Sequence, residues 1–332
     1  MKATDDTLAF RNLTPDNIFD ALEDIGFRCS GRFLALNSYE NRVYKIGLED
    51  GGDVVVKFYR PGRWSDEAIL EEHDFTIDLE EQEIPVIAPL EVDGETLFRS
   101  GPFRLAVFPC RGGRAPELDD PDHLRQLGRF VARIHLVGAA QAFRRRPEIG
   151  VANYAVESRQ YLLSSGFIPA EMRDVYAGIT DQVIARSLDI EKEFSGCARL
   201  RLHGDLHPGN VLVAGDAFHI VDLDDTRTGP AVQDLWMFLS GDREEQAPQL
   251  ALLLEGYQEF REFDARELNL VEMLRSLRIM HYAAWLARRW EDPAFQQAFP
   301  WFDTRRYWDE HVLSLREQVS LLYEPPLEWF GY

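Results

Sequence analysis

The spacing of apolar residues changes character twice along the chain. Over residues 14–26 it is helical, which predicts a short opening helix. Residues 27–59 instead form short runs rich in β-branched and aromatic residues, and the Asp-Gly-Gly sequence at 50–52 suits a hairpin turn between two of them. Ser65 can cap a further helix, and residues 92–108 read as two more strands. The first third of the chain therefore predicts a small antiparallel sheet with a helix beside it.

Beyond residue 113 the pattern becomes helical over long segments. One non-helical stretch interrupts it at 201–225, where Asp, His and Gly are concentrated among β-forming residues, and we expect the chemistry there. No repeat or low-complexity linker separates the two halves. The pattern predicts an α+β fold of two lobes: a sheet-containing N-terminal lobe at 1–108, a hinge at 109–113 and a mainly helical C-terminal lobe at 114–332. The cleft between the lobes would hold the site.

Composition narrows the class of protein. The chain has 332 residues and a net charge of −21, so its average field would repel a phosphate backbone and we expect no nucleic-acid partner. No basic region followed by an apolar run opens the sequence, and no stretch is apolar for ~18 residues, which predicts a cytoplasmic protein without membrane contact. Cys29, Cys110 and Cys197 are odd in number and widely spaced, and are expected to be reduced thiols. We also expect a monomer.

The candidate chemistry lies in two short segments, a catalytic loop at 203–210 and a metal segment at 220–225. Asp205 and Asn210 are held in an irregular loop by the Pro-Gly pair between them, and Asp222 ends a strand-like apolar run. Phosphoryl transfer from ATP requires a carboxylate to position or deprotonate the acceptor hydroxyl and hard oxygen ligands for Mg²⁺. Asp205 suits the first role, and Asn210 and Asp222 suit the second. The plainer alternative is that these residues only cap turns.

The pair of motifs HGDLHPGN and VDLDD resembles the signature of the protein-kinase-like superfamily, in its aminoglycoside phosphotransferase and choline kinase branch. This resemblance implies a bilobal kinase fold with Asp205 and Asp222 as its catalytic residues. His203 is expected to organise the loop, and His203 with His207 lacks the ligand spacing of a zinc site.

A kinase of this kind also needs a lysine on the phosphates, and Lys57 is the charge inside the apolar strand VVVKFY. A buried lysine needs a partner, for which Glu72 on the following helix is expected, with Glu71 as the competitor. The alternatives are an edge-strand lysine that faces water and a solvated helix face.

The nucleotide contacts are expected at two further places. Residues 34–46 contain no glycine-rich loop, so the backbone and short polar side chains, Ser38 first among them, would cover the phosphates. Adenine would lie against the segment around Pro109, which has no N–H, so the Phe108 carbonyl and the Cys110 N–H are expected to contact its edge. A plain hairpin turn and a plain linker are the alternatives.

Regulation through a phosphorylated activation loop is disfavoured. The residue before the catalytic aspartate is Gly204 instead of arginine, and only residues 223–233 separate the metal segment from Asp234. By the resemblance, Asp234 would order the catalytic loop through backbone N–H bonds, with helix capping as the alternative. Asp224 and Asp225 could touch a second metal or a cationic substrate, although a solvated turn is the favoured interpretation.

A closer resemblance, over nearly the whole chain, is to the stress response kinase A family of bacterial Ser/Thr protein kinases. The matching stretches include LNSYENRVY, VVVKFYRPGRW, GPAVQDLWM, WLARRWEDPAFQQAFPWF and the closing EPPL. It implies Asp205 as proton acceptor, Asn210 and Asp222 as Mg²⁺ ligands, Ser38 as an ATP contact, and phosphorylation of protein substrates, the kinase itself included, in a stress response.

Two other functions stay open at this point. A small-molecule kinase of the same fold would act on an amino alcohol, an aminoglycoside or a similar cation, with an aromatic pocket drawn from the tryptophans at 285, 290, 301 and 308. Those side chains are more often core. A pseudokinase-like binding module is disfavoured, because Lys57 and the three residues of the two motifs are all present.

Overall fold

The computed structural model describes residues 10–329. The chain forms two compact units. Among the described residues, unit 1 comprises 10–116 together with the short segments 144–146 and 209–224, and unit 2 comprises the others.

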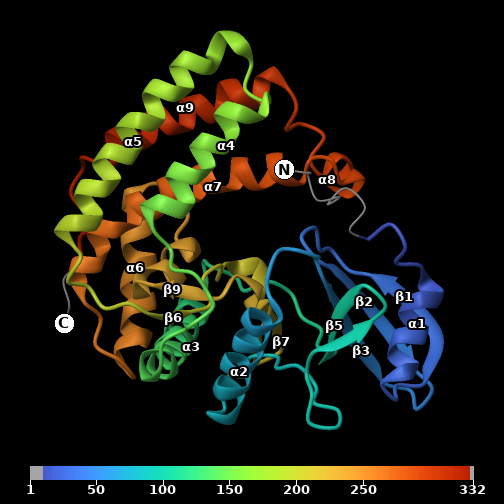
Figure 1. The fold of residues 1–332 in the computed structure, drawn as a ribbon. Helices are drawn as coiled ribbons and strands as arrows, with labels where there is room; N and C mark the ends of the chain where they lie inside the picture. Colours follow the sequence, from blue (N-terminus) through green and yellow to red (C-terminus); the bar gives the residue numbers. More distant parts are fainter. Residues whose placement is uncertain (1–9, 330–332) are drawn as a thin grey trace. The chain divides into compact units, whose positions relative to one another are not determined.

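Unit 1 is built on a five-stranded antiparallel sheet with the strand order β1-β2-β3-β5-β4. Strands β1, β2, β3 and β5 are labelled in Figure 1. Its strands are β1 (Cys29–Ala35), β2 (Arg42–Leu48), β3 (Asp53–Tyr59), β4 (Phe98–Ser100) and β5 (Phe103–Pro109). The predicted hairpin joins β2 to β3, with Ile46 opposite Val54. Strand β3 is central, and its backbone N–H and C=O groups are hydrogen-bonded to β2 on one side and to β5 on the other.

Helices cover both faces of this sheet. Helix α1 (Pro15–Asp24) starts at the Thr14 cap and packs Ile18 and Leu22 against Val56 and Phe58 of β3. Helix α2 (Asp66–Glu81) starts at the Ser65 cap and lies on the opposite face. Side chains alternate between the two faces along a strand, so Lys57 and Tyr59 point to the face covered by α2.

A second hairpin, β7 (Val211–Ala214) and β8 (Ala217–Ile220), also belongs to unit 1. From sequence order we placed all of 114–332 in one helical lobe, but residues 209–224 group with the sheet. The physical reason is backbone pairing: Arg114 and Val213 exchange hydrogen bonds of 3.0 and 2.7 Å, and Ile220 bonds to both Pro85 and Ile87.

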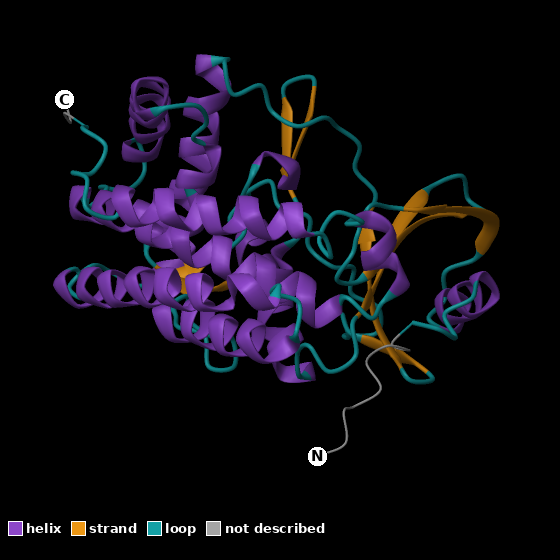
Figure 2. Ribbon diagram, turned by 90° about the horizontal axis from the view of Figure 1, so that it is seen from above, coloured by secondary structure: helices purple, strands orange, loops and turns teal. Residues whose placement is uncertain are grey.

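Unit 2 is mainly helical (Figure 2). Its helices are α3 (Pro121–Ala140), α4 (Glu157–Ser165), α5 (Arg173–Glu193), α6 (Arg243–Gln258), α7 (Val271–Arg289), α8 (Pro293–Ala298) and α9 (Arg305–Leu321), and a short antiparallel pair joins β6 (Leu200–Leu202) to β9 (Arg227–Gly229). Helix α3 packs on α6, α4 on α7 and α5 on α9. The chain is thus α+β, as predicted.

Candidate active site

Lys57 is a buried cation at the centre of the unit 1 sheet. It follows Val56 in β3, so its side chain points to α2, and only 7% of that side chain is exposed. Its ammonium group lies 2.9 Å from Asp224 Oδ1, 3.3 Å from Glu72 Oε1 and 3.4 Å from Asp222 Oδ1. Burial disfavours the charged amine, but the attraction of the three carboxylates outweighs it, so the pKa of Lys57 lies well above its ordinary value. The interpretation of an edge-strand lysine facing water is wrong.

Glu72 is the helix α2 residue that pairs with Lys57. Its second oxygen, Oε2, accepts a hydrogen bond of 2.8 Å from Arg146 Nη2, and the glutamate side chain is 4% exposed. Arg146 also donates to the carbonyl oxygens of Ala68, at 2.7 Å, and Asp224, at 2.6 Å. A carboxylate held by a cation on each side has little freedom, so this network keeps the glutamate directed at the lysine.

Glu71, the competing residue, has a different role. Its carboxylate accepts the backbone N–H groups of Arg144, Arg145 and Arg146 at 2.8, 2.8 and 3.0 Å. These bonds join the segment 144–146 to α2. Sequence reasoning missed Arg146, because a run of three arginines is usually a solvated surface and nothing local marks one of them as buried.

Asn210 and Asp222 are brought together by the β7–β8 hairpin. Asn210 ends a 3₁₀ turn just before β7, and its carbonyl accepts the N–H of Val221 at 3.0 Å. Asp222 follows directly, with a φ of +61°. Such left-handed backbone is unfavourable for a residue with a Cβ and is retained mainly where the surroundings or the function require it. The Asp222 side chain is 57% exposed, so its carboxylate is accessible to a ligand.

This pair fits a hard divalent cation. Carboxylate and amide oxygens are the ligands that Mg²⁺ accepts, and Mg²⁺ usually keeps several waters and phosphate oxygens around one or two protein ligands. Within residues 10–329, no group of three or more His, Cys, Asp or Glu is arranged to hold a metal. Asn210 and Asp222 have the ligand chemistry to hold such an ion together with the phosphates of a nucleotide.

Asp224 is a further residue of this network that the sequence analysis misjudged. We expected a solvated turn, but Asp224 is 3% exposed, and its carboxylate pairs with Lys57 and with Arg63. With two cations already on it, Asp224 supports the lysine and is not available to a second metal. Its place in the sequence Asp-Leu-Asp-Asp gives no indication of burial.

Asp205 lies in unit 2, in the loop that follows β6. Its side chain is 28% exposed, and its Oδ1 is ion-paired with Arg278 Nη1 of helix α7. His207 Nε2 lies 3.8 Å from the other carboxylate oxygen. An accessible carboxylate in an irregular loop suits the role of a base for an acceptor hydroxyl.

Asp234 holds the start of that loop. Its buried carboxylate accepts the backbone N–H groups of His203, at 2.8 Å, and Gly204, at 2.9 Å. Its contact with His135 Nε2 is 3.2 Å, and burial lowers the pKa of His135, so the imidazole is neutral. Gly204 has a φ of +85°, and a Cβ there would overlap the carbonyl oxygen of Asp225, which explains why no larger residue precedes Asp205. The predicted loop-ordering role of Asp234 is confirmed.

The predicted nucleotide contacts lie in unit 1. Ser38 is in the turn between β1 and β2, where its Oγ donates to the carbonyl of Asn41 at 3.2 Å. Phe108 and Cys110 are partly buried, at the end of β5 and just after it, with Phe108 opposite Val55 of β3. Their roles in binding phosphate and adenine stay predictions.

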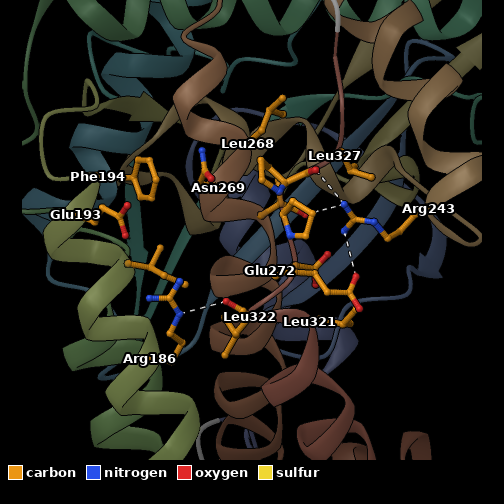
Figure 3. A pocket seen from close by; sticks show the side chains of 15 residues that line it. Arg186, Glu193, Phe194, Arg243, Leu268, Asn269, Glu272, Leu321, Leu322 and Leu327 are labelled. Atoms are coloured by element: carbon orange, nitrogen blue, oxygen red, sulfur yellow. Dashed lines mark hydrogen bonds and ion pairs between the residues drawn. The ribbon is translucent and has the colours of Figure 1, made fainter.

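A small pocket of unit 2 is lined by none of these residues (Figure 3). Its volume is about 80 Å³, far below that of a nucleotide site. Arg243 donates to the carbonyls of Pro325 and Pro326 at 2.7 and 2.9 Å, and Arg186 donates to that of Leu322 at 3.2 Å. The C-terminal EPPL segment therefore forms part of the pocket wall, where Arg243 holds it by hydrogen bonds.

The tryptophans are largely packing residues. Trp308 is 1% exposed, and its ring centroid lies 5.6 Å from that of Phe302. Trp290 packs on the same phenylalanine at 5.1 Å, and Trp285 packs on Phe295 at 4.9 Å. Only Trp301 is strongly exposed, at 42%. These four side chains do not form one aromatic cage.

An antiparallel sheet that buries a lysine–glutamate pair, together with a separate catalytic loop, defines a phosphotransferase of the kinase type. A model of the phosphotransferase enzyme family matches residues 32–270. Stress response kinase A of Escherichia coli is 46% identical over 320 residues, 96% of each chain. A protein of Salmonella typhimurium named serine/threonine protein kinase RdoA is 44% identical over 324 residues, 98% of each chain.

The chain belongs to the phosphotransferase enzyme family and, within it, to the stress response kinase A family. Solved structures agree on the fold. An amicoumacin kinase in complex with AMP-PNP and Ca²⁺ has a TM-score of 0.72 at 19% identity, covering 97% of each chain. The choline kinase LicA of Streptococcus pneumoniae has a TM-score of 0.63 at 13% identity, covering 92% of this chain and 98% of its own. In the described part of the chain, no helix is long and apolar enough to span a bilayer.

Proposed function

We propose that this kinase uses ATP and Mg²⁺ to transfer the γ-phosphate to Ser and Thr hydroxyls of proteins, as part of a bacterial stress response. The observation that carries the ATP assignment is the fixed position of Lys57 among Glu72, Asp222 and Asp224. The protein acceptor is supported by the name of the Salmonella typhimurium relative, serine/threonine protein kinase RdoA.

In unit 1 the residues bind and orient the nucleotide. Lys57 stays protonated at neutral pH, because three carboxylates surround it, and so offers a permanent positive charge to the phosphates. Asn210 and Asp222 would hold Mg²⁺, which when bound would neutralise negative charge that develops on the phosphates during transfer. Ser38 with the turn around it would cover the phosphates, while Phe108 and Cys110 would contact adenine through their backbone.

In unit 2 the residues handle the acceptor. Asp205 would accept the proton of the hydroxyl as its oxygen attacks the γ-phosphorus. Asp234 fixes the preceding backbone, so the base needs no phosphorylated loop to order it. We therefore propose a constitutively assembled, cytoplasmic and monomeric enzyme, which acts on protein substrates, itself included, and not on nucleic acids or membranes.

Transfer of label from γ-labelled ATP in the presence of Mg²⁺ tests this function. Wild type and Asp205→Ala are compared on protein acceptors, on the kinase alone, and on choline and aminoglycosides. Label on Ser or Thr of protein, in wild type only, is the expected result.

A small-molecule kinase is the competing outcome of the same experiment. This alternative is suggested by the solved structures of an aminopropanol kinase and an amicoumacin kinase. At 17% and 19% identity, their likeness to this chain supports the fold alone. Label that appears only on amines would replace the protein-kinase assignment by this one.

A further inference from the structure

Asp205, the candidate base, forms an ion pair with an arginine of its own unit. Arg278, in the middle of α7, places Nη1 on Asp205 Oδ1, and its side chain is 40% exposed. Helix α7 runs from Val271 to Arg289, and the contact comes from a regular helix and not from a mobile loop. A guanidinium group therefore lies beside the oxygen that would receive the acceptor proton.

The neighbouring residues support this arrangement. One helical turn beyond Arg278, the ring of His281 stacks on that of Tyr154 at 4.3 Å between centroids. Arg227 lies over the same tyrosine ring at 5.3 Å. Burial raises the pKa of Tyr154, and the charges of Arg278 and Asp205 are near enough to act on it. Tyr154 thus contacts His281 of helix α7 and the side chain of Arg227, within unit 2 and near the Asp205–Arg278 pair.

The charged side chains around Asp205 affect which substrate can bind there. Asp225 is already paired with Arg227 at 3.2 Å, and Asp205 is paired with Arg278. A substrate ammonium group next to the reacting hydroxyl would lie close to the Arg278 guanidinium. The repulsion between the two positive charges disfavours binding of such a substrate. The net charge of −21 attracts cations from a distance, but salt screens that field beyond roughly 8–10 Å, whereas a contact pair is screened much less.

We propose that Arg278 is the specificity-determining residue for the acceptor, and that it selects a peptide Ser or Thr flanked by Asp or Glu. This proposal rests on the proposed protein-kinase function and names its substrate class. A carboxylate that flanks the substrate hydroxyl can form a bidentate ion pair with the Arg278 guanidinium. Asp205 is then released from Arg278 and can accept the proton of the hydroxyl. The hydroxyl oxygen then bonds to the γ-phosphorus of ATP, the bond from phosphorus to the bridging oxygen of ADP breaks, and the proton passes to Asp205.

The test uses the full-length protein and three peptides that share one Ser, with flanking Glu, Ala or Lys residues. Wild type is compared with Arg278→Glu, Arg278→Lys and Arg278→Ala. Arg306→Glu is the matched control, because it makes the same change in charge at an α9 side chain that is 87% exposed. Nucleotide binding, followed by thermal shift with ATP, shows that each variant is folded.

The expected result is a kcat/KM about tenfold or more higher for the Glu peptide than for the Lys peptide, the size of effect that one close charge pair gives. Arg278→Glu should abolish or invert this ratio, Arg278→Lys should retain part of it, and Arg306→Glu should leave it unchanged. A wild-type ratio near one, or a ratio that Arg278→Glu does not change, overturns the proposal.

Two further outcomes separate this inference from the function on which it rests. If Arg278→Ala raises turnover equally on all three peptides, Arg278 only blocks the base, and the selectivity is refuted while the kinase stands. If no peptide is labelled but choline or an aminoglycoside is, in a manner that Asp205→Ala abolishes, the protein-kinase function itself fails.

Discussion

Arg146 Nη2 lies 2.8 Å from Glu72 Oε2, while the other oxygen of the same carboxylate lies 3.3 Å from Lys57 Nζ. The lysine–glutamate pair is thus held by an arginine that comes from a distant, three-residue segment of the chain. Because this arginine is fully buried and also donates to the carbonyls of Ala68 and Asp224, it fixes the glutamate beside the lysine.

Replacing Arg146 by Met should damage both stability and catalysis. The change leaves Glu72 buried with one cation and leaves two carbonyls without their donor, which costs about 3–5 kcal/mol in the free energy of unfolding. Urea unfolding and the KM for ATP measure the two effects. Arg145→Met is the control, since the Arg145 side chain is exposed and its hydrogen bond to Glu71 comes from the backbone N–H. Equal losses in both variants would contradict the proposed role of Arg146.

Asp222→Gly should separate strain from function. Glycine adopts a φ of +61° without penalty, so the variant should be as stable as wild type or more stable by about 1 kcal/mol. It lacks the carboxylate, so its affinity for Mg²⁺-ATP should fall by about tenfold or more. Thermal unfolding and nucleotide titration with and without Mg²⁺ check both parts. An unchanged metal dependence in Asp222→Gly and in Asn210→Ala would remove these residues from the metal site.

Asp205→Ala should abolish phosphoryl transfer and spare nucleotide binding. The change removes the base for the acceptor but none of the residues assigned to the phosphates or the metal, so kcat should fall by about 10²–10⁴. Single-turnover transfer and equilibrium binding of an ATP analogue give the two numbers. Unchanged turnover would exclude Asp205 from the mechanism.

Asp234→Ala should disorder the catalytic loop. It leaves the N–H groups of His203 and Gly204 buried without an acceptor, which costs about 1–3 kcal/mol for each. We expect lower stability and a strongly reduced kcat at nearly normal ATP affinity. Asp234→Asn, which keeps one acceptor oxygen, should be intermediate; amide hydrogen exchange at residues 203–205 follows the loop directly, and full protection there in Asp234→Ala would refute the prediction.

Glu267 should make stability depend on pH. Burial raises its pKa from 4.5 to about 7, although its carboxylate accepts the N–H of Val232 at 2.8 Å. The folded chain then keeps the Glu267 proton to a higher pH than the unfolded chain, so the free energy of unfolding falls as pH rises from about 4.5 to about 7, by about 3 kcal/mol.

Glu267→Gln lacks this titration. Relative to wild type it should gain stability between pH 5 and pH 7.5, and urea unfolding of both proteins at the two values measures the gain. Other titrating groups are common to the two chains and cancel in the difference. A difference that does not change with pH would show that Glu267 is ionised throughout.

Local sequence was sufficient for several of the helices and strands and for the class of enzyme. The caps at Thr14 and Ser65 mark real helix starts, and the strand period around Lys57 correctly predicts a buried charge, because propensity, capping and alternation act over a few residues. The motifs that contain Asp205, Asn210 and Asp222 indicated a kinase for the same reason: a reaction requires particular groups at a short spacing.

Which charged side chains meet depends on the tertiary fold. Glu71 and Glu72 are adjacent and alike in sequence, yet one accepts three backbone N–H groups while the other pairs with Lys57 and Arg146. The pairing of Arg278 with Asp205 spans 73 residues. Such contacts depend on the direction in which a helix face or hairpin end finally points, and that direction is set by packing across the fold and not by neighbouring residues.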